Sequence, residues 1–316
     1  MKKVFVFILT MVTVAGLCSS PVFAQDYPTK VVRILTSEAG GGGDSLARLV
    51  AQGLSKTMGQ QFIVDNRGIQ SATEVARATP DGYTLLFYGS NAWISPLLRK
   101  STWDPVRDFA PITFAADGIN VLTVNPSVPA KTVAELIALA KAKPGEINFA
   151  SSAAGSATHL AGELFKAMAG VNIVHIPYKG VAAAYNDLIA GRVQMMIGAS
   201  SSMTPLIKAG KIRLLAVGND KTSALFPGTP TVAATVPGYE SGFPFAMFAP
   251  AKTPTAIINR LSQETGRVLK SPESAEKLAN LQLEVVASTP AQLAEKVASD
   301  RAKLGKVIKD AGISED

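Results

Sequence analysis

The spacing of apolar residues near the start of the chain predicts a strand, a helix and a second strand. Residues 31–36 and 62–64 are short apolar runs of strand length. Between them, apolar residues recur every three or four positions over residues 45–58, as on the buried face of a helix. Asp44 stands where a capping side chain would begin this helix, and Gly59 stands where a glycine commonly ends one.

The same order of elements returns in the second half of the chain. Residues 146–150 predict a strand, residues 151–158 are a loop of small residues, and residues 159–168 have helical periodicity. Gly170 ends that helix, and residues 173–176 predict the next strand. The second unit follows the first by about 110 residues, a spacing that fits one unit in each of two α/β lobes.

Further patterns extend this alternation of strands and helices. A capping box, formed by Thr132 and Glu135, opens a helix that reaches about Lys143. Three Ser-Pro or Thr-Pro pairs predict helix starts, with the hydroxyl residue as cap and proline in the first turn, so the C-terminal part is mostly helical. These pairs are Thr253-Pro254, Ser271-Pro272 and Thr289-Pro290. The remaining short apolar runs, which predict strands, are residues 83–88, 195–197 and 213–217.

Two apolar segments, residues 120–124 and 245–249, bracket the middle third of the chain, and we expect the chain to cross between lobes there. At about 150 residues per domain, the length favours two domains. We therefore predict an α/β fold of two lobes, each a sheet flanked by helices, with a C-terminal helical stretch. Residues 25–122 and 247–316 would form lobe I, and residues 123–246 would form lobe II.

The N-terminus has the three parts of a secretory signal peptide. Two lysines form a positive head, residues 4–17 are an apolar run too short to span a membrane, and Ala24 closes a small-residue cleavage site. Residues 1–24 are therefore predicted to be removed on export. Cys18, the single cysteine of the chain, would leave with them.

Composition and charge exclude several classes of function. The chain is 47% hydrophobic and 17% charged, which excludes a disordered protein. Its formal net charge is +7, but lysine and arginine are scattered, which disfavours nucleic-acid binding. With two histidines and one cysteine, the chain lacks the ligands of a zinc or iron–sulfur enzyme. We expect no metal and no cofactor.

Four small-residue clusters follow predicted strands, at the strand ends where α/β sheets bind ligands. The first is a glycine run before a helix, where backbone N–H groups and the helix dipole favour an anion. The second offers hydroxyl groups and a glycine to carboxylate oxygens. Candidate ligand-binding residues in these two clusters are Gly41, Gly42, Gly43, Asp44, Ser152, Gly155, Ser156, Ala157 and Thr158. The other two clusters contribute Ser90, Asn91, Ser200 and Ser201.

Each cluster also has a purely structural interpretation. The glycine run could be a tight turn, and Ser156 or Thr158 could do no more than cap a helix. The glycine run is not a P-loop, because no Gly-Lys-Ser/Thr follows it. It also fails the dinucleotide motif, because Ser45 stands where the third glycine would be.

Little in the sequence supports an enzyme. There is no G-x-S-x-G nucleophile elbow, so a serine hydrolase would have to use one of the two histidines. His175 lies inside an apolar strand and is predicted to be a core residue. His159 opens a helix, and we expect it to form a local hydrogen bond and not to act as a base.

Taken in order, several short motifs resemble the solute receptors of tripartite tricarboxylate transporters, the Bug family. The resemblance covers nearly the whole chain after the signal peptide. It rests on the order and spacing of Tyr27-Pro28-Thr29-Lys30, Gly41-Gly42-Gly43-Asp44, Leu46-Ala47-Arg48, Val64-Asp65-Asn66-Arg67, Pro80-Asp81-Gly82-Tyr83-Thr84-Leu85, Asp104-Pro105-Val106-Arg107-Asp108-Phe109, Val124-Asn125-Pro126, His159-Leu160-Ala161, Glu163-Leu164-Phe165 and Pro177-Tyr178-Lys179-Gly180.

The resemblance implies a periplasmic, two-lobed binding protein of the type II class, a monomer that closes around a small organic carboxylate. In this family the carboxylate is held between the glycine-rich loop and the second small-residue loop. Tyr178 is added to the candidate site because it belongs to the Pro177-Tyr178-Lys179-Gly180 motif. Gly198 replaces an acid that is frequent in relatives, which argues against an amino-acid ligand. Membrane permease subunits are the implied partners. A sensor-only receptor, and an exported hydrolase, remain the alternative functions.

Overall fold

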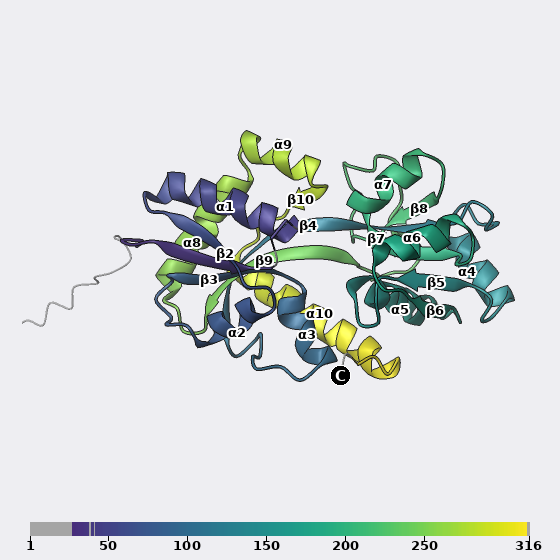
Figure 1. The fold of residues 1–316 in the computed structure, drawn as a ribbon, viewed down its shortest axis with the longest axis horizontal. Coiled ribbons are helices and arrows are strands. Elements are labelled where there is room, and N and C mark those ends of the chain that lie inside the picture. Colours follow the sequence, from purple (N-terminus) through teal and green to yellow (C-terminus); the bar gives the residue numbers. More distant parts are fainter. Residues whose placement is uncertain (1–26, 38, 41, 315–316) are drawn as a thin grey trace, which may run out of the picture.

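One mixed sheet runs through both halves of the molecule (Figure 1). The computed structural model describes residues 27–37, 39–40 and 42–314. The predicted signal peptide and two residues of the first loop, Glu38 and Gly41, lie outside these ranges. The strand order is β2-β1-β3-β9-β4-β7-β5-β6, and β8 and β10 both pair with β4. The result is the predicted α/β architecture of two lobes.

The first lobe is built on parallel strands β1 to β3, which β9 joins in the antiparallel sense. Its strands are β1 (Val32–Thr36), β2 (Phe62–Asn66), β3 (Thr84–Gly89), β9 (Gly242–Pro250) and β10 (Leu283–Val285). Its helices are α1 (Gly42–Met58), α2 (Gln70–Arg77), α3 (Asn91–Leu98), α8 (Thr255–Leu269), α9 (Pro272–Asn280) and α10 (Pro290–Asp310).

The second lobe repeats the arrangement around parallel strands β5, β6 and β7. Its strands are β5 (Asn148–Ser151), β6 (Val174–Pro177), β7 (Met195–Ala199) and β8 (Arg213–Val217). Its helices are α4 (Val133–Ala142), α5 (Ala157–Ala169), α6 (Val181–Ile189), α7 (Ser200–Lys208) and the short 3-10 helix η1 (Val232–Ala234). Helix α10 of the first lobe reaches across to α5, so it packs against both lobes.

Strand β4 (Phe109–Val124) connects the lobes. Its residues up to Ile119 pair with β9, and from Asn120 onward it pairs with β7 and β8. The chain returns beside it, where the Ser241 N–H donates to the Gly218 carbonyl and β9 begins. The two crossings therefore lie side by side, and the sequence pattern had indicated only the last residues of β4.

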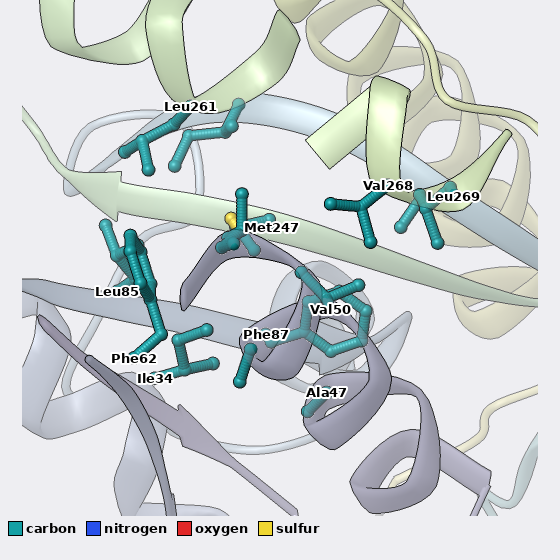
Figure 2. Packing of buried hydrophobic residues seen from close by; sticks show 14 of the residues in the cluster. Ile34, Ala47, Val50, Phe62, Leu85, Phe87, Met247, Leu261, Val268 and Leu269 are labelled. Atoms are coloured by element: carbon teal, nitrogen blue, oxygen red, sulfur yellow. The ribbon is translucent and has the colours of Figure 1, made fainter. Parts of the chain in front are cut away.

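The core of the first lobe fixes where α1 begins. Ile34, Val50, Leu85, Met247 and Leu261 lie buried between the sheet and helices α1 and α8 (Figure 2). Each fully buried side chain of this kind stabilises the fold by roughly 1.5–3 kcal/mol. Because α1 is held along its apolar face, its N-terminus is fixed at the end of β1.

Most local capping signals are confirmed, and three are corrected. Thr132 caps α4, but the Glu135 side chain accepts from the Lys131 N–H and not from that of Thr132, so the capping box is incomplete. Ser271 and Thr289 cap α9 and α10 through their side chains. Thr253 does not cap α8, because Pro254 is the N-cap and the Thr253 hydroxyl donates to the Pro250 carbonyl. Asp44 lies inside α1, which begins at Gly42. Among the described residues, no helix is both long and apolar enough to cross a membrane.

Candidate functional site

The four predicted clusters lie at the carboxyl ends of β1, β3, β5 and β7, and each leads into a helix. The helices begin at Gly42, Asn91, Ala157 and Ser200. A helix N-terminus leaves backbone N–H groups without intrahelical partners, so each of these ends can receive an anion. Gly41 lies outside the described residues. The other candidates can be followed in the structure.

The first loop is held in shape by Asp44. One carboxylate oxygen of Asp44 accepts from the Gly40 N–H at 2.9 Å, and the other accepts from Asn66 at 3.0 Å and lies 2.9 Å from Arg48. Burial acts to raise the pKa of Asp44, but the hydrogen bonds from Gly40, Asn66 and Arg48 together hold it below its usual value. Since both oxygens accept hydrogen bonds within the protein, Asp44 shapes the first loop.

Asn66, at the end of β2, is a residue that the sequence did not single out for the site. Its amide also donates to the Ser37 carbonyl at 2.7 Å, so it ties both ends of the first loop together. Arg48 donates to the Asn66 side-chain oxygen at 2.8 Å. The signal available beforehand was an asparagine at a strand end, the same kind of position that the other clusters occupy.

Phe245 of β9 lies beneath two of the clusters. A Cβ atom added to Gly43 would lie 3.1 Å from the Phe245 ring, and one added to Gly42 or to Gly89 would lie 3.9 Å from it. The half-buried ring therefore joins the first loop to the end of β3. The pattern of apolar residues predicted a crossing between the lobes here, but it gave no sign that this ring would lie against the glycines.

The second loop is a network of short hydrogen bonds. Thr158 Oγ1 accepts from the Ser152 N–H at 2.9 Å and lies 3.0 Å from Ser156 Oγ. Ser156 is the N-cap of α5, where its side chain accepts from the His159 N–H, so the capping interpretation is confirmed for Ser156. Gly155 has a φ of 74°, a backbone conformation that favours glycine.

The two histidines hold the second loop in place through hydrogen bonds. The Gly155 N–H donates to His159 Nδ1 at 2.9 Å, and His175 Nε2 is hydrogen-bonded to Ser151 Oγ at 2.6 Å. The two imidazole rings stack with centroids 3.7 Å apart. Burial lowers the pKa of each to about 4, so both are neutral at pH 7. His159 thus forms the local hydrogen bond that the sequence predicted.

The cluster that follows β7, which contains Ser200 and Ser201, adjoins the second loop. A Cβ atom added to Gly198 would lie 3.5 Å from the Thr158 methyl group. Ser200 is buried, and Ser201 is exposed. Tyr178 lies farther out: its hydroxyl donates to Asp187 at 2.8 Å. Its backbone N–H donates to the Ser151 carbonyl, so Tyr178 supports the second loop through its main chain.

A cavity brings the two lobes' clusters together. Ser90 and Asn91 line it from the first lobe, and Ala157 lines it from the second. The remaining lining residues are Ile94, Leu160, Ala161, Leu164, Glu240, Ser241, Gly242, Pro244, Lys296, Asp300 and Leu304. The members from the return crossing and from α10 could not be found from sequence, because they are far from the loops along the chain and no motif marks them.

The cavity is lined by polar, apolar and charged groups. The Ser90 and Asn91 side chains and the N-termini of α3 and α5 suit an anionic ligand, and Lys296 adds a positive charge. Glu240 and Asp300 add negative charges, and both form ion pairs with Lys296. In the part of the chain that the structure describes, no three His, Cys, Asp or Glu side chains are placed to hold a metal ion.

Comparison with known proteins gives a consistent result. Residues 46–313 match the family model for the "Tripartite tricarboxylate transporter family receptor". BugT of Bordetella pertussis is 32% identical over an alignment of 327 residues, and the alignment covers 99% of this chain and 98% of BugT. The structure of R. palustris Rpa4515 with adipate is 38% identical, with a TM-score of 0.71, and covers 92% of this chain and 99% of that one. MatC from Rhodopseudomonas palustris with bound malate is 26% identical, with a TM-score of 0.68, over 89% and 100% of the two chains.

Proposed function

The chain belongs to the tripartite tricarboxylate transporter receptor family, and from this premise we propose that it binds a small organic carboxylate between its lobes and delivers it to the membrane subunits of a tripartite transporter. It would act in the periplasm as a monomeric receptor, without catalysis and without a cofactor. The adipate and malate in two similar structures support a carboxylate as ligand.

The observation that carries this proposal is the meeting of clusters from both lobes around one cavity. Ser90 and Asn91 at the start of α3 and Ala157 at the start of α5 line the same space. Outside the cavity lining, Phe245 packs against the Gly43 position in the first lobe, and the Thr158 methyl group packs against the Gly198 position in the second. A carboxylate in this space would be within reach of helix N-termini from both halves of the chain.

The energy of binding supports a contribution from both lobes. Micromolar affinity needs about 8 kcal/mol. A helix N-terminus supplies roughly 0.3–1 kcal/mol and a charge-assisted hydrogen bond roughly 1.5–3 kcal/mol. Several such bonds are needed once the cost of ordering is included. A ligand that bonds to both lobes therefore stabilises the arrangement in which they are close.

Direct contacts between the lobes are consistent with such a closing motion. Thr204 of α7 and Gln282 beside β10 are hydrogen-bonded at 3.3 Å, and the Ser223 hydroxyl donates to Glu284 at 2.6 Å. Each of these polar groups can form a hydrogen bond with water in place of its partner when the lobes separate. A ligand then shifts the equilibrium between open and closed arrangements to the extent that it binds the closed one more tightly than the open one.

A thermal-shift screen of the exported chain tests the proposal. The panel would contain mono-, di- and tricarboxylates, aromatic acids and, as matched controls, the corresponding amides. We expect at least one carboxylate to raise the melting temperature while its amide does not, and ester and amide substrates to remain uncleaved. A chain that responds to no carboxylate, or that hydrolyses the esters, would contradict the proposal.

A further inference from the structure

Unpaired polar atoms gather at the crossing between the lobes. Among the described residues, four buried side-chain oxygens or nitrogens lack a hydrogen-bond partner, and three of them lie at this crossing. They are the side-chain oxygens Oδ1 of Asp117, Asn120 and Asn219. All three residues are more than nine-tenths buried. An unpaired buried acceptor costs free energy, so the crossing lacks hydrogen-bond donors.

Asp117 occupies the contact between the two crossing segments. Its other carboxyl oxygen, Oδ2, accepts from the Asn219 amide at 3.1 Å, so it is bonded to the segment that follows β8 of the second lobe. Its Oδ1 faces the return crossing, since a Cβ at Gly242 would lie only 2.6 Å from it. The absence of a side chain at Gly242 is what allows the carboxyl group to lie against β9.

Of the three unpaired oxygens, only that of Asp117 can gain a proton under ordinary conditions. The amide oxygens of Asn120 and Asn219 are acceptors only. A protonated Asp117 is neutral and can donate, so the crossing gains a hydrogen-bond donor. An ionised Asp117 would instead be a buried charge with one amide partner, which is unfavourable.

The charged groups around Asp117 act in both directions, and burial is the largest effect on its pKa. Burial raises its pKa to about 7, Lys296 of α10 opposes this, and Glu240, Asp300 and Asp220 add to it. Lys296 is itself bound by Asp300 at 2.7 Å and by Glu240 at 3.0 Å, so its charge is largely compensated.

We propose that Asp117 is the positioning residue of the hinge, and that the closed arrangement of the lobes holds it in the protonated form. The Asn219 amide ties Asp117 to the second lobe. An ionised Asp117 favours the arrangement in which water reaches its carboxyl group, so loss of the proton favours separation of the lobes. The receptor's closure is therefore linked to proton uptake. This inference rests on the proposed closing motion, but its test requires no ligand.

The exported chain offers a simple way to follow the distance between the lobes. It contains no cysteine after the predicted cleavage site. Two exposed positions, Glu276 on α9 and Lys208 on α7, can be changed to cysteine and spin-labelled. The distance between the labels would then be measured at pH 6 and pH 9, without ligand, in the otherwise unchanged chain and in the isosteric variant Asp117→Asn.

We expect the mean distance in the unchanged chain to increase between pH 6 and pH 9, whereas Asp117→Asn keeps the short distance at both. Glu146→Gln is the matched control, because it removes an exposed carboxylate of the second lobe, and it should retain the pH-dependent change. An unchanged distance in the parent chain, or an equal change in Asp117→Asn, would overturn the inference. Neither result would bear on whether the protein binds carboxylates.

Discussion

The ring of Phe245 lies 3.1 Å from where a Cβ would stand on Gly43, and Ser37 Oγ lies at the same distance on another side. Gly43 is therefore needed for packing, whereas the neighbouring Gly42 has open space, with its nearest atom 3.9 Å away. The two glycines thus have different roles. Gly43 leaves room for the Phe245 ring against the loop, and Gly42 is exposed on the surface of the loop.

Gly43→Ala should displace the Phe245 ring or the first loop. Overpacking of this kind costs roughly 1–3 kcal/mol, and we expect a lower free energy of unfolding together with weaker carboxylate binding. Gly42→Ala is the matched control, and it should be neutral or stabilising by up to about 1 kcal/mol, because alanine is the better helix former. Urea unfolding and calorimetric titration measure both effects. Equal effects of the two substitutions would contradict this assignment.

Thr158→Val should destabilise the second loop. The substitution keeps the shape of the side chain but leaves the Ser152 N–H without its partner at 2.9 Å. The expected cost is about 1–3 kcal/mol, the penalty for an unsatisfied buried donor. Thr158→Ser retains the hydroxyl and should recover most of the stability and of the binding. If the serine variant is as unstable as the valine variant, the hydroxyl network does not hold the loop.

The histidine pair should make the protein less stable in acid. Burial lowers the folded-state pKa of His159 and His175 from 6.5 to about 4. The unfolded chain therefore takes up protons at a higher pH than the folded chain does, and stability is lost as the pH falls from about 6.5 to 4. Glu163 and Lys166 are the charged neighbours of His159 on α5.

A variant separates this effect from general acid denaturation. His159→Asn keeps an oxygen that can accept from the Gly155 N–H but removes a titrating group. Its melting temperature should fall less than that of the parent between pH 7.5 and pH 5. An identical fall in both proteins would show that the pair does not contribute.

Asp117 should act in the opposite pH range. Its folded-state pKa is raised to about 7, so the folded chain binds a proton that the unfolded chain has lost, and stability falls as the pH rises from about 4 to 7. Asp117→Asn cannot ionise, and its stability relative to the parent should increase over that range. Chemical unfolding at pH 5 and pH 8 measures the difference, and a difference that is independent of pH would contradict the prediction.

Local signals allowed much of the fold to be predicted from the sequence. The strand at residues 213–217 and the caps Ser271 and Thr289 are found where their patterns indicated, because capping and apolar runs depend on neighbouring residues. Strand β4 was predicted only in part. Its first residues include Pro111, Asp117 and Gly118, which interrupt the apolar pattern, and they form a strand because β9 pairs with them.

The position of the candidate loops could be predicted from their small residues, and Ser90, Asn91 and Ala157 line one cavity, whereas their role in binding stays a prediction. Nothing in the sequence indicated that the Asp44 carboxylate would hold the first loop in shape. Partners such as Phe245 and Lys296 come from distant parts of the chain, and no local pattern indicates where tertiary packing will place a ring or an ion pair.

The most direct test of the account is a crystal structure of the exported chain with the carboxylate that raises its melting temperature most. We predict that one carboxylate group of the ligand lies within hydrogen-bond distance of the N-terminal residues of α5 and of a loop of the first lobe at the same time. A ligand bound to one lobe alone, or placed away from Ser90, Asn91 and Ala157, would contradict the account.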